Sequence, residues 1–380
     1  MPDDLTIMNR IKATPQTILQ GKGYFIWKIR YCEGGDVNAI ADLAVGSQFT
    51  HAIIKVANGS RTYNIHPQTG EDLVGPMVKA LRSKDISPWG WQYIYGYDPI
   101  AEADKAIQRV KQFNLGGFVI DAEAEYKAPG MERKARQYMN RLRTGLPNTP
   151  LALSSYRFPS YHPQLPWDAF LDKCDLAMPQ VYWEQSYNPA SQLARCVNEY
   201  QEQTHSRPVI PTGSAYKRGD WQTTPEQVIE FMDKAIELNI PAVNFWEWAH
   251  TRKHLPETWD AVRDYYWPVE EKEDIAALYI SALNTHDPEK VLALYDDDAV
   301  HVTSKRTIQG KQAIREWYRE FFREILPNGV FYLTNSIGEK SLRFINWTAN
   351  SSAGEVNISS DTLSLYQGKI MYHYSFFVVT

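Results

Sequence analysis

The residues best suited to chemistry are two acids, Asp121 and Glu123, which close a short apolar run. Side chains alternate along an extended strand, so Val119 and the two acids share one face, with the acids at its carboxyl end. Burying two carboxylates on one face is costly unless they have partners or a task. A structural ion pair with Lys55 or Arg157, at the ends of two other predicted strands, is the alternative to a catalytic role.

The spacing of the two acids narrows the chemistry that they can perform. Residues i and i+2 of a strand lie about 6.6 Å apart along it, so both carboxylates stand on one wall. A standard glycosidase pair instead flanks the scissile bond from opposite sides. Two carboxylates on one wall suit substrate assistance: one acid protonates the leaving oxygen, and its neighbour orients the 2-acetamido group of the sugar, whose carbonyl oxygen attacks. The pattern therefore predicts a substrate rich in N-acetylhexosamine.

Residues at other predicted strand ends favour a carbohydrate site. Gln180 and Tyr182 alternate onto one face, and Trp246 and Trp248 do the same. Aromatic faces pack against the apolar C–H faces of sugars and leave polar edges for hydroxyl groups. Packing in a barrel core is the alternative role for any one of these aromatic residues. The predicted substrate-contacting residues are Trp91, Tyr93, Tyr156, Gln180, Trp246 and Trp248.

These candidates need a scaffold that brings many strand ends together. Short apolar strands alternate with amphipathic helical stretches from residue 24 to 267, which matches a (β/α)8 TIM barrel of about 250 residues. A doubly wound open sheet would carry a phosphate-binding Gly-rich turn, and Glu33-Gly34-Gly35-Asp36 lacks that spacing. The predicted strands are 24–31, 50–57, 88–95, 117–123, 150–156, 176–183, 208–214 and 242–248, and the clearest helical patterns are 101–113, 131–142, 189–203 and 225–238.

The segment from Trp267 to Asp274 reads as a domain boundary, because Pro268 ends the last helical pattern and a charged run follows. We therefore predict a barrel domain over 1–268 and a second domain over 269–380. The second domain places helical patterns before strands, which indicates an α+β fold. Its predicted helices are 273–284, 288–296 and 311–325, and its predicted strands are 329–336, 341–350, 354–366 and 369–379.

The Asp-x-Glu at the end of the fourth strand resembles that of glycoside hydrolase family 25, the lysozyme-like muramidases, and of the chitinase-like family 18. The likeness covers residues 24–267. The longer chitinase pattern would need Asp where this chain has Gly116 and Val119. Muramidases also carry an Asp near the end of strand 1, a position for which Glu33 is the candidate here.

This resemblance implies roles for individual residues. Glu123 would be the acid/base, Asp121 would orient the acetamido group, and Tyr182 would help to hold it. A Trp at the end of the last strand, Trp246 or Trp248, would form the base of the sugar subsite. The expected function is hydrolysis of a peptidoglycan-like or chitin-like glycan by a retaining mechanism. The alternative is a degenerate barrel that binds glycan without cleaving it.

The second domain has its own resemblance. The stretches 275–284, 294–300 and 308–314, with Gly368-Lys369-Ile370, look like a SnoaL-like or nuclear-transport-factor-2-like domain. This implies a cone-shaped pocket and, in some members, acid–base catalysis, for which His301, Asp361 and His373 are the candidates. Ligand binding or dimerisation without catalysis is the favoured role, because a shared fold does not carry function. The run 372–379 is apolar on both faces, which predicts a homodimer through this domain.

Composition excludes several classes of protein. The 380 residues have a net charge of −5, which offers no basic face for nucleic acid, and no apolar run is long enough to span a membrane. Three cysteines and the absence of His-Glu-x-x-His, Cys-x-x-Cys and Gly-x-Ser-x-Gly patterns predict no disulfide framework, metal, cofactor or serine nucleophile. The N-terminus lacks a signal-peptide pattern, which predicts a cytoplasmic protein, or an extracellular one if the N-terminus is incomplete.

Overall fold

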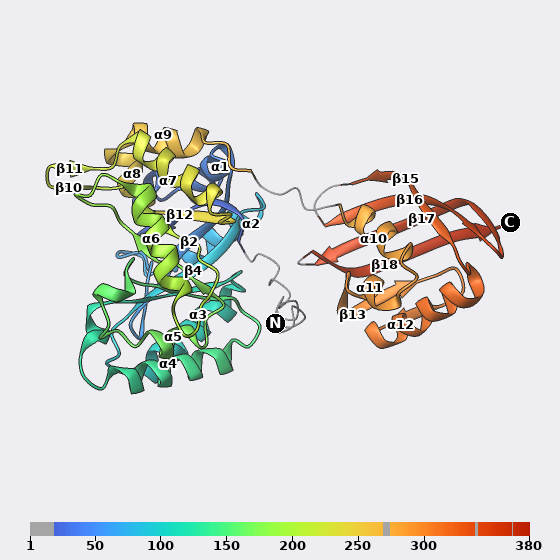
Figure 1. Ribbon diagram of the computed structural model, residues 1–380, viewed down its shortest axis with the longest axis horizontal. Helices are drawn as coiled ribbons and strands as arrows, with labels where there is room; N and C mark the ends of the chain where they lie inside the picture. The colour runs from blue at the N-terminus through green and yellow to red at the C-terminus, as the bar shows by residue number, and fades with distance from the viewer. Residues whose placement is uncertain (1–18, 269–273, 339–340, 367) are drawn as a thin grey trace, which may run out of the picture. The chain divides into compact units, whose positions relative to one another are not determined.

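The computed structural model describes residues 19–268, 274–338, 341–366 and 368–380. The chain divides into two compact units, Met1–Val269 and Glu270–Thr380 (Figure 1). Within the described ranges, no helix combines the length and the apolar character needed to cross a lipid bilayer.

The first unit is built on a strongly curled parallel sheet. Its hydrogen-bonded strand order is β7-β6-β5-β4-β2-β1-β12-β9-β8. β7 and β8 are successive pieces of one stretch, and isolated parallel bridges join Tyr156 to Gln180 and Ala177 to Val209, so both ends of the sheet lie in residues 176–181. The strands are β1 (Gly21–Ile26), β2 (Phe49–Asn58), β4 (Ser87–Ile94), β5 (Phe118–Ala122), β6 (Leu151–Ser154), β7 (Leu176–Ala177), β8 (Gln180–Val181), β9 (Thr212–Ser214) and β12 (Ala242–Trp246).

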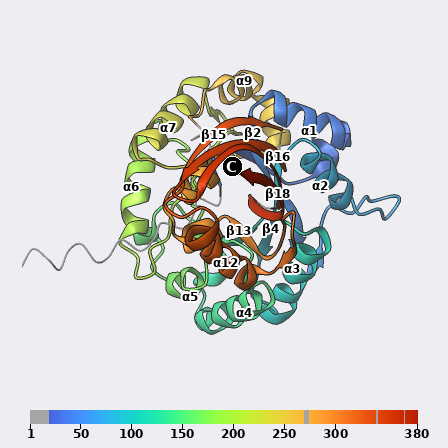
Figure 2. The same cartoon turned by 90° about the vertical axis from the view of Figure 1, so that its right-hand side faces the viewer.

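Helices surround this sheet, as Figure 2 shows end-on, which gives the barrel-like α/β form expected from the alternating pattern. Local signals begin several helices. The Asp98 side chain caps α3, and Thr224 forms a capping box with Gln227 at the start of α7. The helices are α1 (Val37–Gly46), α2 (Val74–Arg82), α3 (Pro99–Phe113), α4 (Met131–Gly145), α5 (Trp167–Leu171), α6 (Pro189–Gln201), α7 (Pro225–Glu237), α8 (Trp248–His254) and α9 (Pro256–Asp264).

The first unit also contains several short strands and turns. β3 (Arg61–Thr62) pairs antiparallel with β2, and β10 (Lys217–Arg218) forms a hairpin with β11 (Trp221–Gln222). The described part of this unit also contains four 3-10 turns: η1 (Ile29–Tyr31), η2 (Glu33–Gly35), η3 (Ala124–Lys127) and η4 (Pro159–Tyr161).

Side chains that alternate along the strands form two separate hydrophobic clusters. Ile26 and Ile120 point outward and pack in the cluster between sheet and helices. Phe25, Val119 and Trp91 point inward and belong to a separate interior cluster. The inward row of β5 is therefore the row that ends in Asp121, as the alternation predicts.

A buried lysine joins the amino end of β1 to the end of α9. The Lys22 ammonium, on the outer face of β1, donates to the carbonyl oxygens of Val262 (2.7 Å), Arg263 (3.0 Å) and Tyr265 (2.7 Å). These carbonyls close α9, so a cation satisfies acceptors that the helix itself leaves open.

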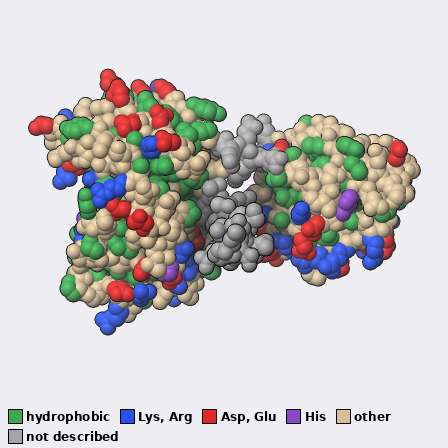
Figure 3. All heavy atoms as spheres, viewed as in Figure 1, with side chains coloured by type: hydrophobic (Ala, Val, Ile, Leu, Met, Phe, Trp, Pro, Cys, Tyr) green, Lys and Arg blue, Asp and Glu red, His purple; other side chains and the backbone are tan. Residues whose placement is uncertain are grey.

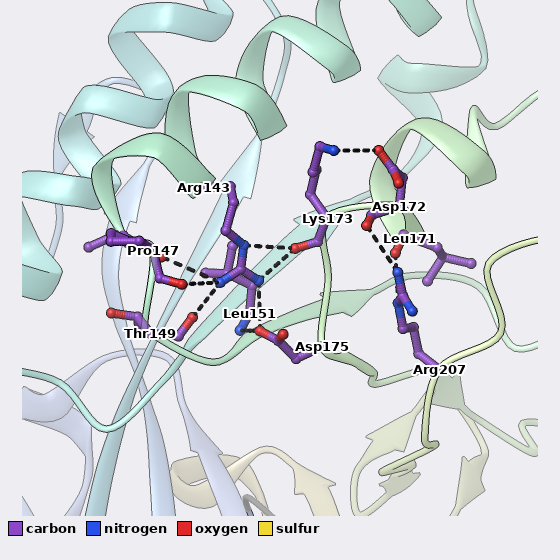
Figure 4. A network of polar contacts seen from close by, with 10 residues as sticks. Arg143, Pro147, Thr149, Leu151, Leu171, Asp172, Lys173, Asp175 and Arg207 are labelled. Carbon is purple, nitrogen blue, oxygen red and sulfur yellow. Dashed lines mark hydrogen bonds and ion pairs between the residues drawn. The ribbon is translucent and has the colours of Figure 1, made fainter. Parts of the chain in front are cut away.

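A second network ties α4 to the strands β6 and β7 (Figure 4). Arg143 pairs with Asp175 at 2.7 Å, and Asp175 also accepts the amide N–H of Leu151 at the start of β6. Arg207 donates to two carbonyl groups nearby. Both arginines donate hydrogen bonds to backbone carbonyl groups. Arg143 donates to the carbonyls of Lys173, Leu146, Pro147 and Thr149, and Arg207 donates to those of Leu171 and Asp172.

The second unit is a six-stranded mixed sheet with helices on one face. The strand order is β14-β13-β18-β17-β16-β15, in which only β13 and β18 are parallel. The predicted helix 288–296 is shorter, because β13 already begins at Tyr295. The elements are α10 (Ile275–Leu283), α11 (Pro288–Leu292), β13 (Tyr295–Val302), β14 (Thr307–Gln309), α12 (Lys311–Glu320), a π-helical turn (Phe321–Ile325), β15 (Val330–Ile337), β16 (Leu342–Ser351), β17 (Gly354–Tyr366) and β18 (Lys369–Val379).

The helices bury one face of this sheet and carry charge on their outer side. Tyr279, Ile314 and Trp317 pack with Trp347 and Leu363 in one core. Charged side chains gather over α12 on the outer surface (Figure 3). They include ion pairs such as that between Arg315 and Glu289 at 2.6 Å.

We predict that Lys22→Met destabilises the first unit. The substitution keeps the apolar stem but leaves three carbonyl groups without their donor, so the free energy of unfolding should fall by about 3 kcal/mol. Urea denaturation followed by tryptophan fluorescence measures the change. The matched control is Lys84→Met, which removes an exposed ion pair with Asp42 and should cost less than about 1 kcal/mol. Equal effects of the two substitutions would contradict this role of Lys22.

Candidate functional site

A cavity of about 690 Å³ opens at the carboxyl ends of the curled sheet of the first unit. That size is ordinary for a small-molecule or sugar site. Acids, cations, amides, aromatic rings and one serine hydroxyl line it. Seven of the predicted residues lie in this lining, namely Asp121, Glu123, Tyr182, Trp91, Tyr93, Gln180 and Trp246.

An amide group joins the two acids. The Gln180 side-chain nitrogen, from β8, donates to Asp121 Oδ1 at 3.0 Å and to Glu123 Oε1 at 2.9 Å. The same nitrogen lies 3.4 Å from Ser154 Oγ. One side chain from across the sheet therefore fixes both carboxyl groups on the same wall of the cavity.

The buried position of Asp121 makes its ionisation unfavourable. Asp121 is only 6 % exposed, and its burial, together with the charge of Glu123, raises the pKa of its carboxyl well above the usual value, while Lys55 opposes the shift. Adjacent carboxylates resist joint ionisation. The surroundings of the pair therefore favour the protonated form of Asp121.

Lys55 supplies positive charge next to the pair. It comes from β2 and is 5 % exposed, with its ammonium 4.4 Å from the Trp91 ring centre, 4.7 Å from Tyr63 and 5.7 Å from Trp27. Burial lowers the pKa of Lys55 to about 8, against the opposing charge of Asp121. Cation–π contacts of this kind stabilise an ammonium without a salt bridge to a carboxylate.

The structural ion pair that was the alternative role for the acids is not formed. In the described part of the chain, neither Asp121 nor Glu123 makes a salt bridge with Lys55 or Arg157. The acids bond instead to the amide of Gln180.

Aromatic rings form the floor of the cavity. Trp246, at the end of β12, lies edge-on to Trp91 with ring centres 5.4 Å apart and is 5.6 Å from Phe25. The Trp91 indole donates to the carbonyl of Ile26 at 3.2 Å, which fixes its orientation. Trp27 continues this surface outward from Trp246 at 6.1 Å.

Tyr182 and Tyr216 form the opposite side. Their rings meet edge to face at 5.5 Å, and burial raises the pKa of the Tyr182 hydroxyl well above its usual value. The Tyr216 hydroxyl donates to Glu184 Oε2 at 3.1 Å, and Arg218 lies 3.4 Å from the same oxygen. This side therefore combines the segment after β8 with the β10–β11 hairpin.

Tyr93 connects the cavity to its rim. Its hydroxyl donates to Glu125 Oε2 at 2.6 Å, and burial, reinforced by that bond and by the nearby acids, raises the pKa of the phenol. Glu125 lies in η3, just beyond the strand that carries the acid pair, and is not part of the cavity lining.

Trp248 and Glu33, two of the predicted site residues, lie outside the cavity. The prediction that Trp246 and Trp248 share one face is wrong. β12 ends at Trp246 and α8 begins at Trp248, so strand alternation stops between them. Trp248 is buried against the ring of Trp259. Its indole donates to Glu33 Oε1, which also pairs with Arg252 at 2.9 Å. Glu33 therefore supports α8 and does not line the cavity.

Tyr156 also lies outside the lining. Its ring stacks on His162 at 3.7 Å, and the Lys127 ammonium lies 3.9 Å from the ring centre. The regular strand β6 ends at Ser154, and Tyr156 keeps only an isolated parallel bridge to Gln180.

Sequence reasoning assigned no sugar-binding role to several lining residues. Phe25, Lys55 and Ser154 occupy inward strand positions that alternation could have identified. The others come from strand ends or loops, where alternation gives no direction. The unassigned lining residues are Phe25, Trp27, Lys55, Ser154, Arg157, Glu184, Gln185, Tyr216 and Arg218.

The second unit buries its three predicted acid–base residues together. The rings of His301 and His373 stack at 4.2 Å, His373 Nε2 lies 3.1 Å from Asp361 Oδ2, and Tyr295 bonds to His373 Nδ1 at 2.5 Å. Burial raises the pKa of Asp361 to about 8 and lowers the pKa of His373 to about 3. All three side chains are fully buried, so the group is an uncharged network inside the core at neutral pH.

No group of three or more His, Cys, Asp or Glu side chains in the described ranges is arranged to hold a metal ion.

Comparison with known families identifies part of the chain. A family model for the SnoaL-like domain matches residues 276–373, so this region is a SnoaL-like domain. The match lies wholly in the second unit. No curated protein matches the chain.

Solved structures give similarities of low overall score. An NTF2-like protein of unknown function from Cytophaga hutchinsonii is 14 % identical over 28 % of this chain and 88 % of its own, with a TM-score of 0.24. An NTF-2-like protein of unknown function from Burkholderia xenovorans is 18 % identical over 29 % and 86 %, with a TM-score of 0.26. A protein of unknown function with a cystatin-like fold from Nostoc punctiforme is 16 % identical over 28 % and 86 %, with a TM-score of 0.24.

We predict that Lys55→Met raises the pKa of Asp121 further. The substitution removes the positive charge that favours the ionised form of this carboxyl. A pH titration of the Asp carboxyl carbons by NMR measures the shift in the full chain. The control is Lys28→Met, which removes a cation packed on Trp27 and should leave the Asp121 titration unchanged. A pKa of Asp121 that stays constant or falls in Lys55→Met would refute the electrostatic link.

Proposed function

We propose that the first unit is a closed (β/α)8 barrel of glycoside hydrolase type that cleaves an N-acetylhexosamine glycan with retention of configuration. The observation that carries this proposal is the pair Asp121 and Glu123, joined through the Gln180 amide on one wall of an aromatic-floored cavity. Closure of the barrel is supported by the parallel bridges that link residues 176–181 to both of their neighbours.

The aromatic floor supports a sugar as the ligand. Trp91, Trp246 and Phe25 offer flat apolar surface, while the wall above them offers carboxyl, amide and phenol groups. A pyranose ring has the same division, with C–H faces and hydroxyl edges. The cavity therefore fits a sugar better than it fits a wholly apolar ligand.

The first chemical step uses the single proton of the acid pair. Glu123 gives a proton to the glycosidic oxygen as the bond from that oxygen to C1 breaks. The acetamido carbonyl oxygen of the same sugar forms a new bond to C1, giving a cyclic oxazolinium. Asp121, which is ionised because the single proton of the pair lies on Glu123 in the reacting complex, accepts the N–H of the acetamido group and stabilises the positive charge. The Tyr182 hydroxyl donates to the attacking oxygen.

The second step restores the enzyme. Glu123, left as a carboxylate, takes a proton from water while the water oxygen bonds to C1 and the oxazolinium ring opens. Two displacements at C1 give net retention. Lys55 favours ionised Asp121 during both steps, and the Gln180 amide keeps the two carboxyl groups side by side.

A glycan-binding barrel without hydrolysis is the second candidate. The observation that favours it is the position of Glu33, the residue expected to replace the strand-1 acid of muramidases. Glu33 is engaged by Arg252 and Trp248 outside the cavity, so the described lining has no acid from the end of β1. Turnover separates the two candidates, because the binding protein retains the sugar without releasing a reducing end.

We also propose that the second unit forms a homodimer through the open face of its sheet. On β18, Tyr372, Tyr374, Phe376 and Val378 are exposed, while the alternate residues His373 and Ser375 are buried. The same open face continues over β17 to β15, with Ile358 66 % exposed. Exposed apolar patches of this kind mark interaction sites, and a second copy presents the matching surface. The further members of this patch are Tyr366, Phe344 and Tyr332.

We predict that substitutions of the two acids change turnover and sugar binding according to the role of each acid. Glu123→Gln should lower kcat by about two to four orders of magnitude, because it removes the proton donor. Asp121→Asn should also lower kcat strongly while leaving sugar binding within about threefold, because its charge matters most in the transition state. Reducing-end release from N-acetylglucosamine oligomers measures the rates, and calorimetry measures binding.

The matched control is Glu125→Gln, which changes a rim acid that bonds to Tyr93 and should lower kcat only mildly. The wild-type pH–rate profile should fall on the basic side as the proton of the acid pair is lost. Equal turnover by wild type and Glu123→Gln would end the glycosidase proposal, and binding without any turnover would favour the second candidate.

We predict that Tyr374→Glu combined with Phe376→Glu dissociates the dimer. Two carboxylates on each copy would meet across the interface and lose solvation, so the dimer Kd should rise by at least about a hundredfold. Light scattering at micromolar concentration measures the mass of the full chain. The control, Arg319→Glu on the outer side of α12, should leave the mass unchanged. A monomeric wild type would refute the proposal.

A further inference from the structure

Arg157 is a cation in the cavity wall that no described residue pairs. It follows β6, lines the cavity and is half-buried. Its guanidinium forms no hydrogen bond or ion pair with the described residues, and its one close contact of this kind is the Phe158 ring, 5.1 Å from its centre. A guanidinium has five N–H donors, so all of them are available to a ligand or to water.

The other charged groups of the lining are already matched. Arg218 faces Glu184 at 3.4 Å. Lys55 rests on three rings, and its charge acts on Asp121. The amide of Gln180 bonds to both members of the acid pair. Arg157 is thus a lining cation that has neither an acidic partner nor a hydrogen bond among the described residues.

Counting charges over the lining gives the same result. The lining contains three cationic side chains (Lys55, Arg157 and Arg218) and three acidic ones (Asp121, Glu123 and Glu184). Burial and the charge of Glu123 raise the pKa of Asp121, which favours its protonated form and shifts the balance of the lining towards positive charge. Burial also lowers the pKa of Arg157, although a guanidinium stays charged in proteins. An anion on the ligand would balance this excess.

We propose that the glycan bound in this cavity carries an acidic substituent, a carboxylate or a sulfate, that the Arg157 guanidinium binds through paired N–H groups. The inference rests on the proposed function and names its substrate class, an acidic N-acetylhexosamine glycan in place of neutral chitin. The planar fork of arginine matches the oxygen spacing of both anions. Lysine at this position would supply charge without the fork.

Binding to three disaccharides tests the inference. The ligands are di-N-acetylchitobiose, its 6-O-sulfated form, and N-acetylglucosaminyl-N-acetylmuramic acid, which carries a carboxylate. Calorimetry uses the full chain with Glu123→Gln, so that turnover does not consume the ligand. One of the two acidic sugars should bind at least about tenfold more tightly than chitobiose, the gain expected of a charge-assisted hydrogen bond. Which of the two does so distinguishes carboxylate from sulfate.

Variants at position 157 then test whether Arg157 causes the preference for an acidic sugar. Arg157→Gln should abolish the tenfold preference and leave chitobiose binding within about twofold, whereas Arg157→Lys should retain part of it. Arg218→Gln, which changes an exposed cation already facing Glu184, should keep the preference. The salt dependence of the acidic sugar's Kd should weaken in Arg157→Gln, because one ionic contact is lost.

Four outcomes overturn the inference. Equal binding of chitobiose and both acidic sugars does so, and so does a preference that survives Arg157→Gln. If wild type hydrolyses neutral N-acetylglucosamine oligomers while showing no acidic preference, the inference fails and the proposed hydrolase stands. If none of the three disaccharides binds, the inference and the proposed function fail together.

Discussion

Repulsion between two neighbouring carboxyl groups is the constraint on which the cavity of the first unit depends. Asp121 and Glu123 stand on one buried wall, where two full negative charges would be costly. Three features offset that cost: the raised pKa of the Asp121 carboxyl, the amide of Gln180 and the cation of Lys55. The aromatic rings around Lys55 follow from the same constraint, since they hold an ammonium near Asp121 without neutralising it in a salt bridge.

The sequence was sufficient to predict residues that lie on continuous strands. Parallel strands in register bring equivalent positions to one end, so alternation along β5 and β8 correctly brought Asp121, Gln180 and Tyr182 to one cavity. It failed where a strand stops. Trp248 was expected beside Trp246, but the chain enters α8 there and turns the indole into the core. Tyr216 and Arg218 were missed because the direction of a hairpin side chain is not encoded in a two-residue period.

The second unit illustrates a different limit of prediction. Its motifs and its order of helices before strands indicated a SnoaL-like α+β domain, and the matched family model agrees over residues 276–373. The burial of His301 and His373 could not be read in advance, because β18 is apolar on both faces and the pattern does not say which face the helices cover. The helices cover the face that holds the polar network, and the aromatic face is left open.

The uncharged state of that network makes proton uptake part of the folding equilibrium of the second unit. Unfolding would return Asp361 from a pKa of about 8 to its usual value near 3.8, and would return His373 from about 3, and His301 from a value also lowered by burial, towards 6.5. Between these two ordinary values the unfolded chain gains two histidine protons and loses one aspartic proton, so stability rises with pH. Above pH 6.5 only the aspartic proton is lost on unfolding, so stability falls towards pH 8. From these three groups alone, the second unit would be most stable slightly below neutral pH.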